Sequence, residues 1–165
     1  MEDSIYSKII PPRKHSYRDG FSNLSAIDSL TGSQLKALEK RLLIDIVIGD
    51  NGKVDSLVVD TLVYVNSTEA VLSFEKLIKD NKIGIYSKLI LITAIYRLSG
   101  DESHLNMAIS IFHELRSESQ VIGGMYYLSF FKSRSRRVRN ILRKLVFNQN
   151  YFVRYNAWKF LKRSV

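Results

Sequence analysis

The segment LILITAIY, residues 89–96, places a small residue, Thr93, three positions before an aromatic residue, Tyr96. Three further pairs of this kind are Thr61/Tyr64, Gly124/Tyr127 and Ala157/Phe160. The four small residues follow one another at spacings of 32, 31 and 33 positions. Residues three and four positions apart share one face of a helix. The segment therefore predicts a helix that recurs at a nearly constant interval along the chain.

A second apolar pattern runs through the segments between these copies. Its rows, spaced by 35 and 33 positions, are Ala70, Leu105 and Val138; Phe74, Ile109 and Leu142; and Leu77, Phe112 and Leu145. Within each segment the three residues fall at i, i+4 and i+7, which is one stripe of a helix. Pairs of helices that cannot bury their apolar faces alone are typical of stacked helical repeats. The two patterns together predict an all-α fold, a short α-solenoid of helical hairpins.

Helical periodicity is continuous from residue 31 onward. Eight helices are predicted, at about 31–48, 55–66, 68–80, 83–98, 102–116, 119–132, 135–148 and 151–163. Thr31 and Gln34 form a candidate capping box at the start of the first helix, and the glycine-rich stretch 49–52 ends it. Residues 1–30 lack clear periodicity, so we expect an N-terminal arm or irregular cap there, followed by a repeat domain over 31–165.

Length and composition narrow the class of protein. A chain of 165 residues with 45% hydrophobic residues suits one domain with its own core. It has no cysteine, which excludes disulfides and thiolate zinc sites. The longest apolar run, residues 89–96, is far shorter than the roughly 20 residues of a membrane span. With acidic residues at positions 2 and 3 instead of an apolar signal segment, we expect a cytoplasmic protein.

The segment NQNYFVRYNA, residues 148–157, resembles the turn and inner-helix start of a HEAT repeat, in which a Val-Arg pair precedes an alanine. An asparagine stands here where an aspartate is usual. The segment DSLVVDTL, residues 55–62, is similar but lacks the arginine. The resemblance extends over about residues 33–165 and implies a right-handed solenoid, in which Arg154 has a structural role between neighbouring repeats. The structural repeat positions are then Thr61, Tyr64, Thr93, Tyr96, Gly124, Tyr127, Arg154, Ala157 and Phe160.

Few residues offer catalytic chemistry. The three histidines, His15, His104 and His113, have no neighbouring acids at metal-ligand spacing. No phosphate-binding loop or nucleophile elbow is present, and Gly123-Gly124 lies inside a predicted helix, where it favours close helix packing. We therefore expect neither enzymatic activity nor a metal or other cofactor.

Charge is distributed very unevenly. The last 47 residues contain 11 of the 25 lysines and arginines and none of the 16 acids. The first 118 residues hold the other 14 cations and all 16 acids, a net charge of −2. Such asymmetry indicates a surface for an acidic partner. The residues predicted to face outward and bind it are Arg134, Arg136, Arg137, Arg139, Arg143, Lys144, Lys159, Lys162 and Arg163.

Two classes of partner fit this surface. A small HEAT-like protein without catalytic residues resembles the immunity proteins of bacterial toxin systems, including those of contact-dependent inhibition. This resemblance implies a stoichiometric inhibitor of a cognate toxin domain, which we expect to be a nuclease. The alternatives are a nucleic-acid-binding protein that uses the same basic face and a general protein-binding repeat module. Against nucleic acid, most tyrosines occupy repeat positions expected in the core, so no aromatic platform is predicted beside the arginines.

Overall fold

The computed structural model describes residues 8–10, 12, 22–48 and 52–162, and over these residues the protein is all-α apart from one small hairpin. Its elements are α2 (Leu24–Asp28), α3 (Gly32–Ile44), β1 (Val47–Ile48), β2 (Lys53–Val54), α4 (Ser56–Tyr64), α5 (Thr68–Lys79), α6 (Ile85–Ser99), α7 (Leu105–Glu114), α8 (Glu118–Ser129), α9 (Arg136–Leu145) and α10 (Tyr151–Lys162). Every predicted helix is found, and the seven after residue 54 lie within their predicted ranges to within one residue. In the described part of the chain, none of the helices is long and apolar enough to cross a membrane.

Local capping residues set the start of most helices. The predicted capping box is confirmed: the Thr31 hydroxyl accepts from the Gln34 N–H, and the Gln34 side chain accepts from the Thr31 N–H. The side chains of Asp55, Ser67, Ser117 and Ser135 cap α4, α5, α8 and α9 in a similar way. Each cap satisfies backbone N–H groups that have no partner inside their own helix.

The predicted end of the first helix was wrong. It ends at Ile44 and not near Ile48, and the following residues form β1, which pairs antiparallel with β2. Ile46, between helix and strand, is only 2% exposed, so burial in the core competes successfully with one further turn of helix. Gly52, which directly precedes β2, has a φ of +66°. A Cβ at this position would lie 1.7 Å from the Lys82 carbonyl oxygen. A side chain at position 52 would therefore collide with the α5–α6 connection.

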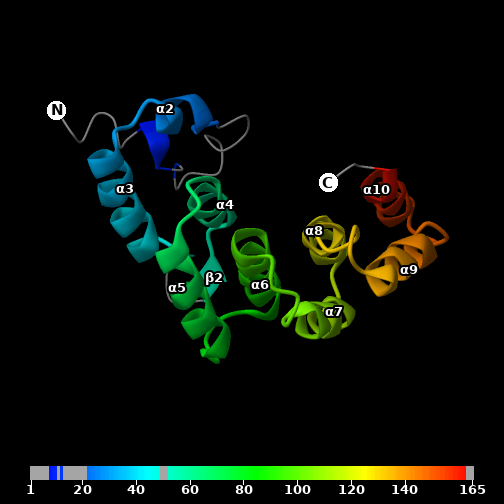
Figure 1. Ribbon diagram of the computed structural model, residues 1–165. Coiled ribbons are helices and arrows are strands. Elements are labelled where there is room, and N and C mark those ends of the chain that lie inside the picture. Colours follow the sequence, from blue (N-terminus) through cyan, green and yellow to red (C-terminus); the bar gives the residue numbers. More distant parts are fainter. Residues whose placement is uncertain (1–7, 11, 13–21, 49–51, 163–165) are drawn as a thin grey trace.

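From α4 onward the helices alternate between two rows. Helices α4, α6, α8 and α10 contact one another in sequence order, and we call them the inner row. Helices α5, α7 and α9 form the outer row, and each contacts the inner-row helices that precede or follow it in the sequence. Figure 1 shows that the rows curve together, with the inner row on the inside of the arc and α3 beside α4. The far end of the inner row is α10, which packs against α8 and α9.

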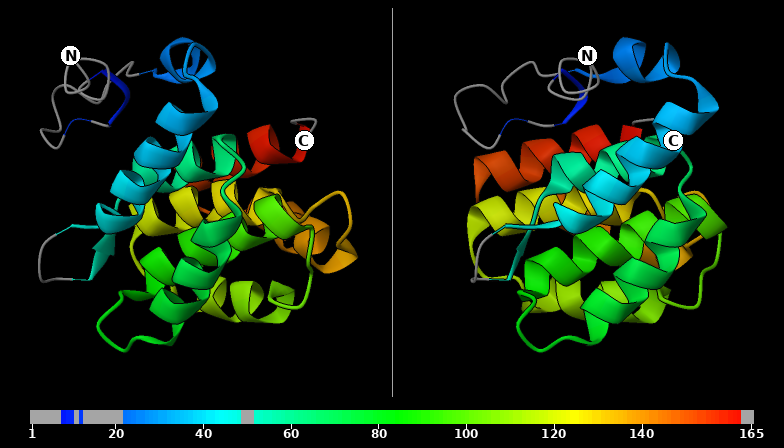
Figure 2. Two further views of the ribbon diagram at one scale, coloured as in Figure 1. Left: turned by 60° about the vertical axis from the view of Figure 1, so that its left-hand side comes forward. Right: turned by 90° about the vertical axis from the view of Figure 1, so that its left-hand side faces the viewer.

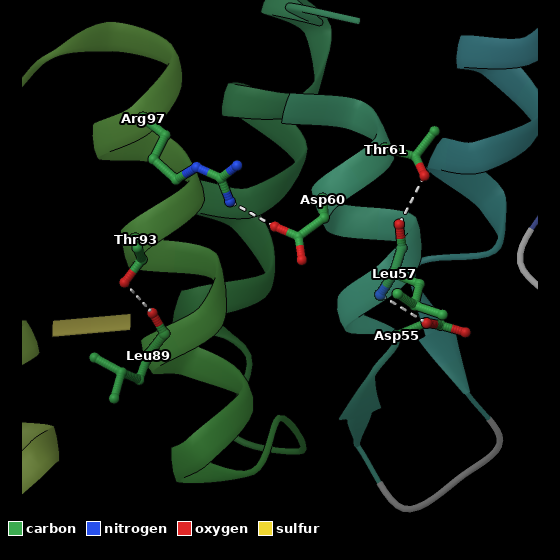
Figure 3. Close-up of polar contacts among 7 residues, drawn as sticks. All are labelled: Asp55, Leu57, Asp60, Thr61, Leu89, Thr93 and Arg97. Atoms are coloured by element: carbon green, nitrogen blue, oxygen red, sulfur yellow. Dashed lines mark hydrogen bonds and ion pairs between the residues drawn. The ribbon is translucent and has the colours of Figure 1, made fainter. Parts of the chain in front are cut away.

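The small residues of the repeat pattern all lie in inner-row helices. Thr61, Thr93, Gly124 and Ala157 are all buried. In α4 and α6 the threonine hydroxyl donates to the carbonyl oxygen four residues earlier, Leu57 in one helix and Leu89 in the other (Figure 3). In α8 a Cβ on Gly124 would lie 2.5 Å from Leu115 Cδ1, so glycine at this position allows α7 and α8 to pack closely.

The described part of residues 1–30 covers the first end of the inner row (Figure 2). Ile9 is fully buried and Ile27 is 3% exposed. The Asn23 side-chain amide donates to the Ile9 carbonyl oxygen (2.8 Å) and to Thr61 Oγ1 (3.0 Å). These contacts attach the segment to α4.

Candidate functional site

The arginine-rich helix α9 is amphipathic, with its cations opposite the core. Val138 and Leu142 are fully buried, and Ser135 Oγ caps the helix by accepting from the Val138 N–H (3.3 Å). Arg136, Arg143 and Lys144 are exposed. Because residues 136 and 143 are opposite position 138 on a helical wheel, the burial of Val138 directs them to solvent.

The predicted cations of α9 fall into two groups. Arg136 and Lys144 have no hydrogen bond or ion pair within the described residues, and Arg143 has only a 3.4 Å bond to the neighbouring Asn140. Arg134 lies 3.8 Å from Glu102, and Arg137 Nη1 donates to Asn106 Oδ1 (2.6 Å) in α7. Arg136 and Lys144 are therefore available to a partner without loss of a hydrogen bond or ion pair among the described residues, and Arg143 would give up only its bond to Asn140.

Arg139 differs from the other predicted binding residues. It is only partly exposed, and its guanidinium donates to the carbonyl oxygens of Lys132 (2.7 Å) and Ser133 (3.2 Å). These carbonyls follow the end of α8, where acceptors lack intrahelical partners. The expectation that Arg139 points freely outward was therefore wrong, because its side chain holds the α8–α9 connection.

The start of α9 carries charge that opposes the helix dipole. Arg136 and Arg137 occupy its first turn, whereas α5 and α8 have Glu69 and Glu118 there. Cations at a helix N-terminus disfavour the helix by a few tenths of a kcal/mol each. A feature that costs stability without serving the fold is typical of a functional surface.

Helix α10 carries the remaining predicted cations. Lys159 and Lys162 are exposed, and the Lys162 ammonium lies 4.0 Å from the centroid of the Trp158 ring. Arg163 lies outside the described residues. The predicted structural bridge by Arg154 is not seen: its contacts among the described residues are the Asn148 carbonyl oxygen (3.5 Å) and the Tyr151 ring (5.8 Å to the centroid). Both belong to its own helix and the turn before it, so Arg154 is part of the exposed surface.

Helix α10 also exposes aromatic side chains that the sequence analysis had not assigned to a surface. The exposed fractions are 60% for Tyr151, 60% for Phe152, 48% for Tyr155 and 47% for Trp158. The signal was present in the sequence, because Val153, Ala157 and Phe160 form the buried stripe of the same helix. Positions 151, 155 and 158 fall opposite that stripe at i, i+4 and i+7. These aromatic side chains form an exposed surface on α10 that the sequence analysis did not predict.

Three of these aromatic residues line a shallow groove at the α9–α10 junction. The groove has a volume of about 440 Å³ and is lined by Val146, Tyr151, Arg154, Tyr155 and Trp158. The rings of Tyr151 and Tyr155 stack with centroids 6.2 Å apart and an interplanar angle of 19°. An apolar groove with one arginine in its wall suits a side chain that is itself apolar and has a carboxylate nearby.

The aromatic repeat positions have diverse surroundings. Tyr127 and Phe160 are each 7% exposed, and Tyr96 stacks on Phe131 with centroids 4.3 Å apart. Burial raises the pKa of Tyr127 well above its ordinary value. Tyr64 is 44% exposed and donates to Asp28 Oδ1 (2.7 Å), and this bond raises the pKa of Tyr64. The aromatic residues of the repeat pattern therefore differ in their exposure, from 7% for Tyr127 and Phe160 to 44% for Tyr64.

A chain of contacts along the inner row was not anticipated. The carboxylate of Asp60 in α4 pairs with the guanidinium of Arg97 in α6 (Figure 3). Arg97 also lies 4.6 Å from the centroid of the Phe130 ring, which follows α8. Asp60, Arg97 and Phe130 all have partners inside the fold, so their contacts connect successive inner-row helices. These side chains are therefore not candidates for binding a ligand.

The two described histidines have local surroundings. His104 Nδ1 lies 3.0 Å from Ser103 Oγ, and His113 is exposed beside Phe112. Across residues 8–10, 12, 22–48 and 52–162, no three His, Asp or Glu side chains gather as a metal-binding group. The candidate site is the exposed surface of α9 and α10, because it carries the predicted cations and the exposed aromatic side chains. Comparisons of this chain with protein families, curated proteins and solved structures found no match.

Proposed function

We propose that this chain is a HEAT-like binding protein that inhibits an acidic partner protein by occupying it stoichiometrically, as the immunity proteins of bacterial toxin systems do. The observation that carries this proposal is the coincidence, on α9 and α10, of unpaired cations with exposed aromatic side chains. The last 47 residues have no acid that could neutralise these cations. Trp, Tyr and Arg are the residues that most often dominate the energy of protein interfaces.

The architectural part of the proposal is a short right-handed α-solenoid of helical hairpins. Its support is the alternation of α4 to α10 between two rows, with the small residues of the repeat pattern buried in the inner row. In such a fold each hairpin packs mainly on its neighbours. Helix α10 exposes Tyr151, Tyr155 and Trp158 on the face opposite its buried stripe. A partner that covers this face would remove their apolar surface from water.

Nucleic acid is the second candidate, because cations beside aromatic rings also bind single strands. Stacking of bases requires free ring faces, however. Here Tyr155 and Arg154 lie against the Tyr151 ring, and Lys162 lies against the Trp158 ring. The rings form a contact layer with one another and with cations, which favours a protein partner.

The test combines binding partners with surface variants. The protein is titrated with the purified product of a gene adjacent to its own, and separately with labelled duplex and single-stranded DNA and RNA at ~150 mM salt. We expect one acidic protein to bind at nanomolar strength and generic nucleic acid to be ignored. The triple variant R136E/R143E/K144E should slow association at least tenfold, because steering by charge acts mainly on the association rate.

The matched control reverses three exposed lysines elsewhere, K36E/K40E/K53E, and changes net charge equally. Association that slows equally in both variants would indicate a general charge effect without a defined surface. Tight nucleic-acid binding with no protein partner would overturn the proposal. The logarithm of that affinity would then fall linearly with the logarithm of salt, by roughly 0.9 per phosphate contacted on duplex DNA.

A further inference from the structure

We infer that the groove at the α9–α10 junction is the anchor point of the interface, and that it takes an acidic segment of the partner with a large apolar side chain. The inference rests on the proposed function and names the part of the partner that is recognised. The groove is open to solvent and is lined by Val146, Tyr151, Arg154, Tyr155 and Trp158. Its volume of about 440 Å³ exceeds what one aromatic side chain fills.

The apolar requirement follows from the exposed rings. Tyr155 and Trp158 are about half exposed, although both present large apolar surface. Their neighbours Phe147 and Phe152 are more exposed still, at 86% and 60%. Covering such a patch removes apolar surface from water, at about 25 cal/mol for each Å². The greatest gain comes from an apolar side chain that lies in the groove against the exposed parts of these rings.

The acidic requirement follows from the rim. Arg154 lines the groove, and Lys162 lies 4.0 Å from the ring centroid of Trp158, which also lines it. Because no acid occurs after Glu118, the described residues of α9 and α10 include no carboxylate that could pair with these cations. A partner carboxylate beside the inserted side chain would pair with Arg154 in a partly desolvated setting, where charge-assisted hydrogen bonds are strongest.

A second copy of the same chain does not fit this groove. Symmetric pairing of the α10 face would place Arg154 and Lys162 of one copy against the same cations of the other. Like charges opposed across an interface cost several kcal/mol. The charge pattern therefore selects an acidic partner over self-association.

The chain contains a natural reporter for this site, because Trp158 is its only tryptophan. Three tryptophan-free peptides of twelve residues serve as probes: an acidic peptide with one central phenylalanine, the same peptide with alanine instead, and a basic counterpart with lysines in place of the acids. A twelve-nucleotide thymidine strand is the fourth probe. Trp158 emission and its quenching by acrylamide are followed during each titration of the full chain.

We expect the acidic phenylalanine peptide to give a saturable blue shift and to protect Trp158 from acrylamide. The alanine peptide should bind roughly tenfold more weakly or worse, since burial of one aromatic side chain accounts for at least that factor. The basic peptide should have no effect. Tyr155→Ala and Arg154→Ala should each weaken the acidic peptide by roughly tenfold, while Leu72→Ala, at a side chain 72% exposed on α5, leaves it unchanged.

Three outcomes would overturn the inference. They are equal binding of the phenylalanine and alanine peptides, no response to either acidic peptide, and preferential binding of the thymidine strand with quenching of Trp158.

The test also separates this inference from the proposed function. If a partner protein binds and loses affinity in R136E/R143E/K144E but not in Tyr155→Ala, the groove is not the anchor and the proposed function stands. If the acidic peptide binds as expected but no acidic protein partner exists, the proposed function fails alone.

Discussion

Helices α5 and α9 occupy equivalent places in the outer row, and they differ almost only in the residues they turn to solvent. Ala70 and Phe74 in α5 correspond to Val138 and Leu142 in α9, and all four are fully buried. Each helix begins after a buried serine, and the serine Oγ accepts from the N–H three residues later, at 3.1 Å in α5 and 3.3 Å in α9. The two helices are therefore built on the same internal plan.

Their surfaces have opposite character. Helix α5 has Glu69 in its first turn and lysines in its last, which matches the helix dipole at both ends. Helix α9 has Arg136 and Arg137 in its first turn and further cations in its last. The shared interior shows what the fold requires, and the contrast outside shows where the sequence was free to serve another purpose. That freedom was used in α9 to gather positive charge at some cost in helix stability.

The largest expected effect tests the shared interior. Phe74→Ala and Leu142→Ala should each lower the free energy of unfolding by ~2–5 kcal/mol, because both leave a cavity in a fully buried site. Urea denaturation of the two variants measures this. Leu72→Ala, at an exposed position of α5, is the control and should change stability by no more than about 0.5 kcal/mol. A loss below ~1 kcal/mol for Leu142→Ala alone would mean that α9 is not packed as α5 is.

A smaller effect tests the two serine caps. Ser67→Ala and Ser135→Ala should each cost ~1 kcal/mol, because a backbone N–H at the helix start loses its acceptor. Ser67→Ala should be the more costly of the two, since the Ser67 hydroxyl also donates to the Glu39 carboxylate, a contact that Ser135 lacks among the described residues. Thermal unfolding measured with replacement by threonine as well as alanine separates capping from packing. Equal stability of the alanine and wild-type proteins would contradict the caps.

The smallest effect tests the surface contrast. Arg136→Glu should raise the free energy of unfolding by a few tenths of a kcal/mol at low salt, because the new charge suits the start of α9. Glu69→Arg in α5 should lower it by a similar amount for the opposite reason. Both changes should fade in ~1 M salt, where the screening length is about 3 Å. A loss of stability in Arg136→Glu would show that the arginine serves the fold.

Much of the architecture was predictable because it depends on short-range patterns. The capping box at Thr31 involves residues three positions apart, and the buried stripes of α5, α7 and α9 repeat with the period of a helix. The same periodicity, applied to α10, would have placed Tyr151, Tyr155 and Trp158 opposite Val153. The exposure of these three aromatic residues therefore also follows from a local pattern.

Other features depend on residues far apart in the chain. The first helix stops at Ile44 because Ile46 reaches the core and β1 finds β2, neither of which the helical period reveals. Asp60 and Arg97 pair across 37 positions, and Arg137 meets Asn106 across 31.

The sequence by itself determined the helical class, the helix starts and the concentration of positive charge in the last 47 residues. These properties follow from local hydrogen bonding, the helical period and composition. Only the tertiary structure decided which cations are available: Arg139 is occupied by the carbonyls that follow α8, whereas Arg136 and Lys144 have no partner among the described residues. The physical reason is that a side chain's partner is set by which backbone and side-chain groups packing brings within about 3 Å, and periodicity in one helix carries no information about its neighbours.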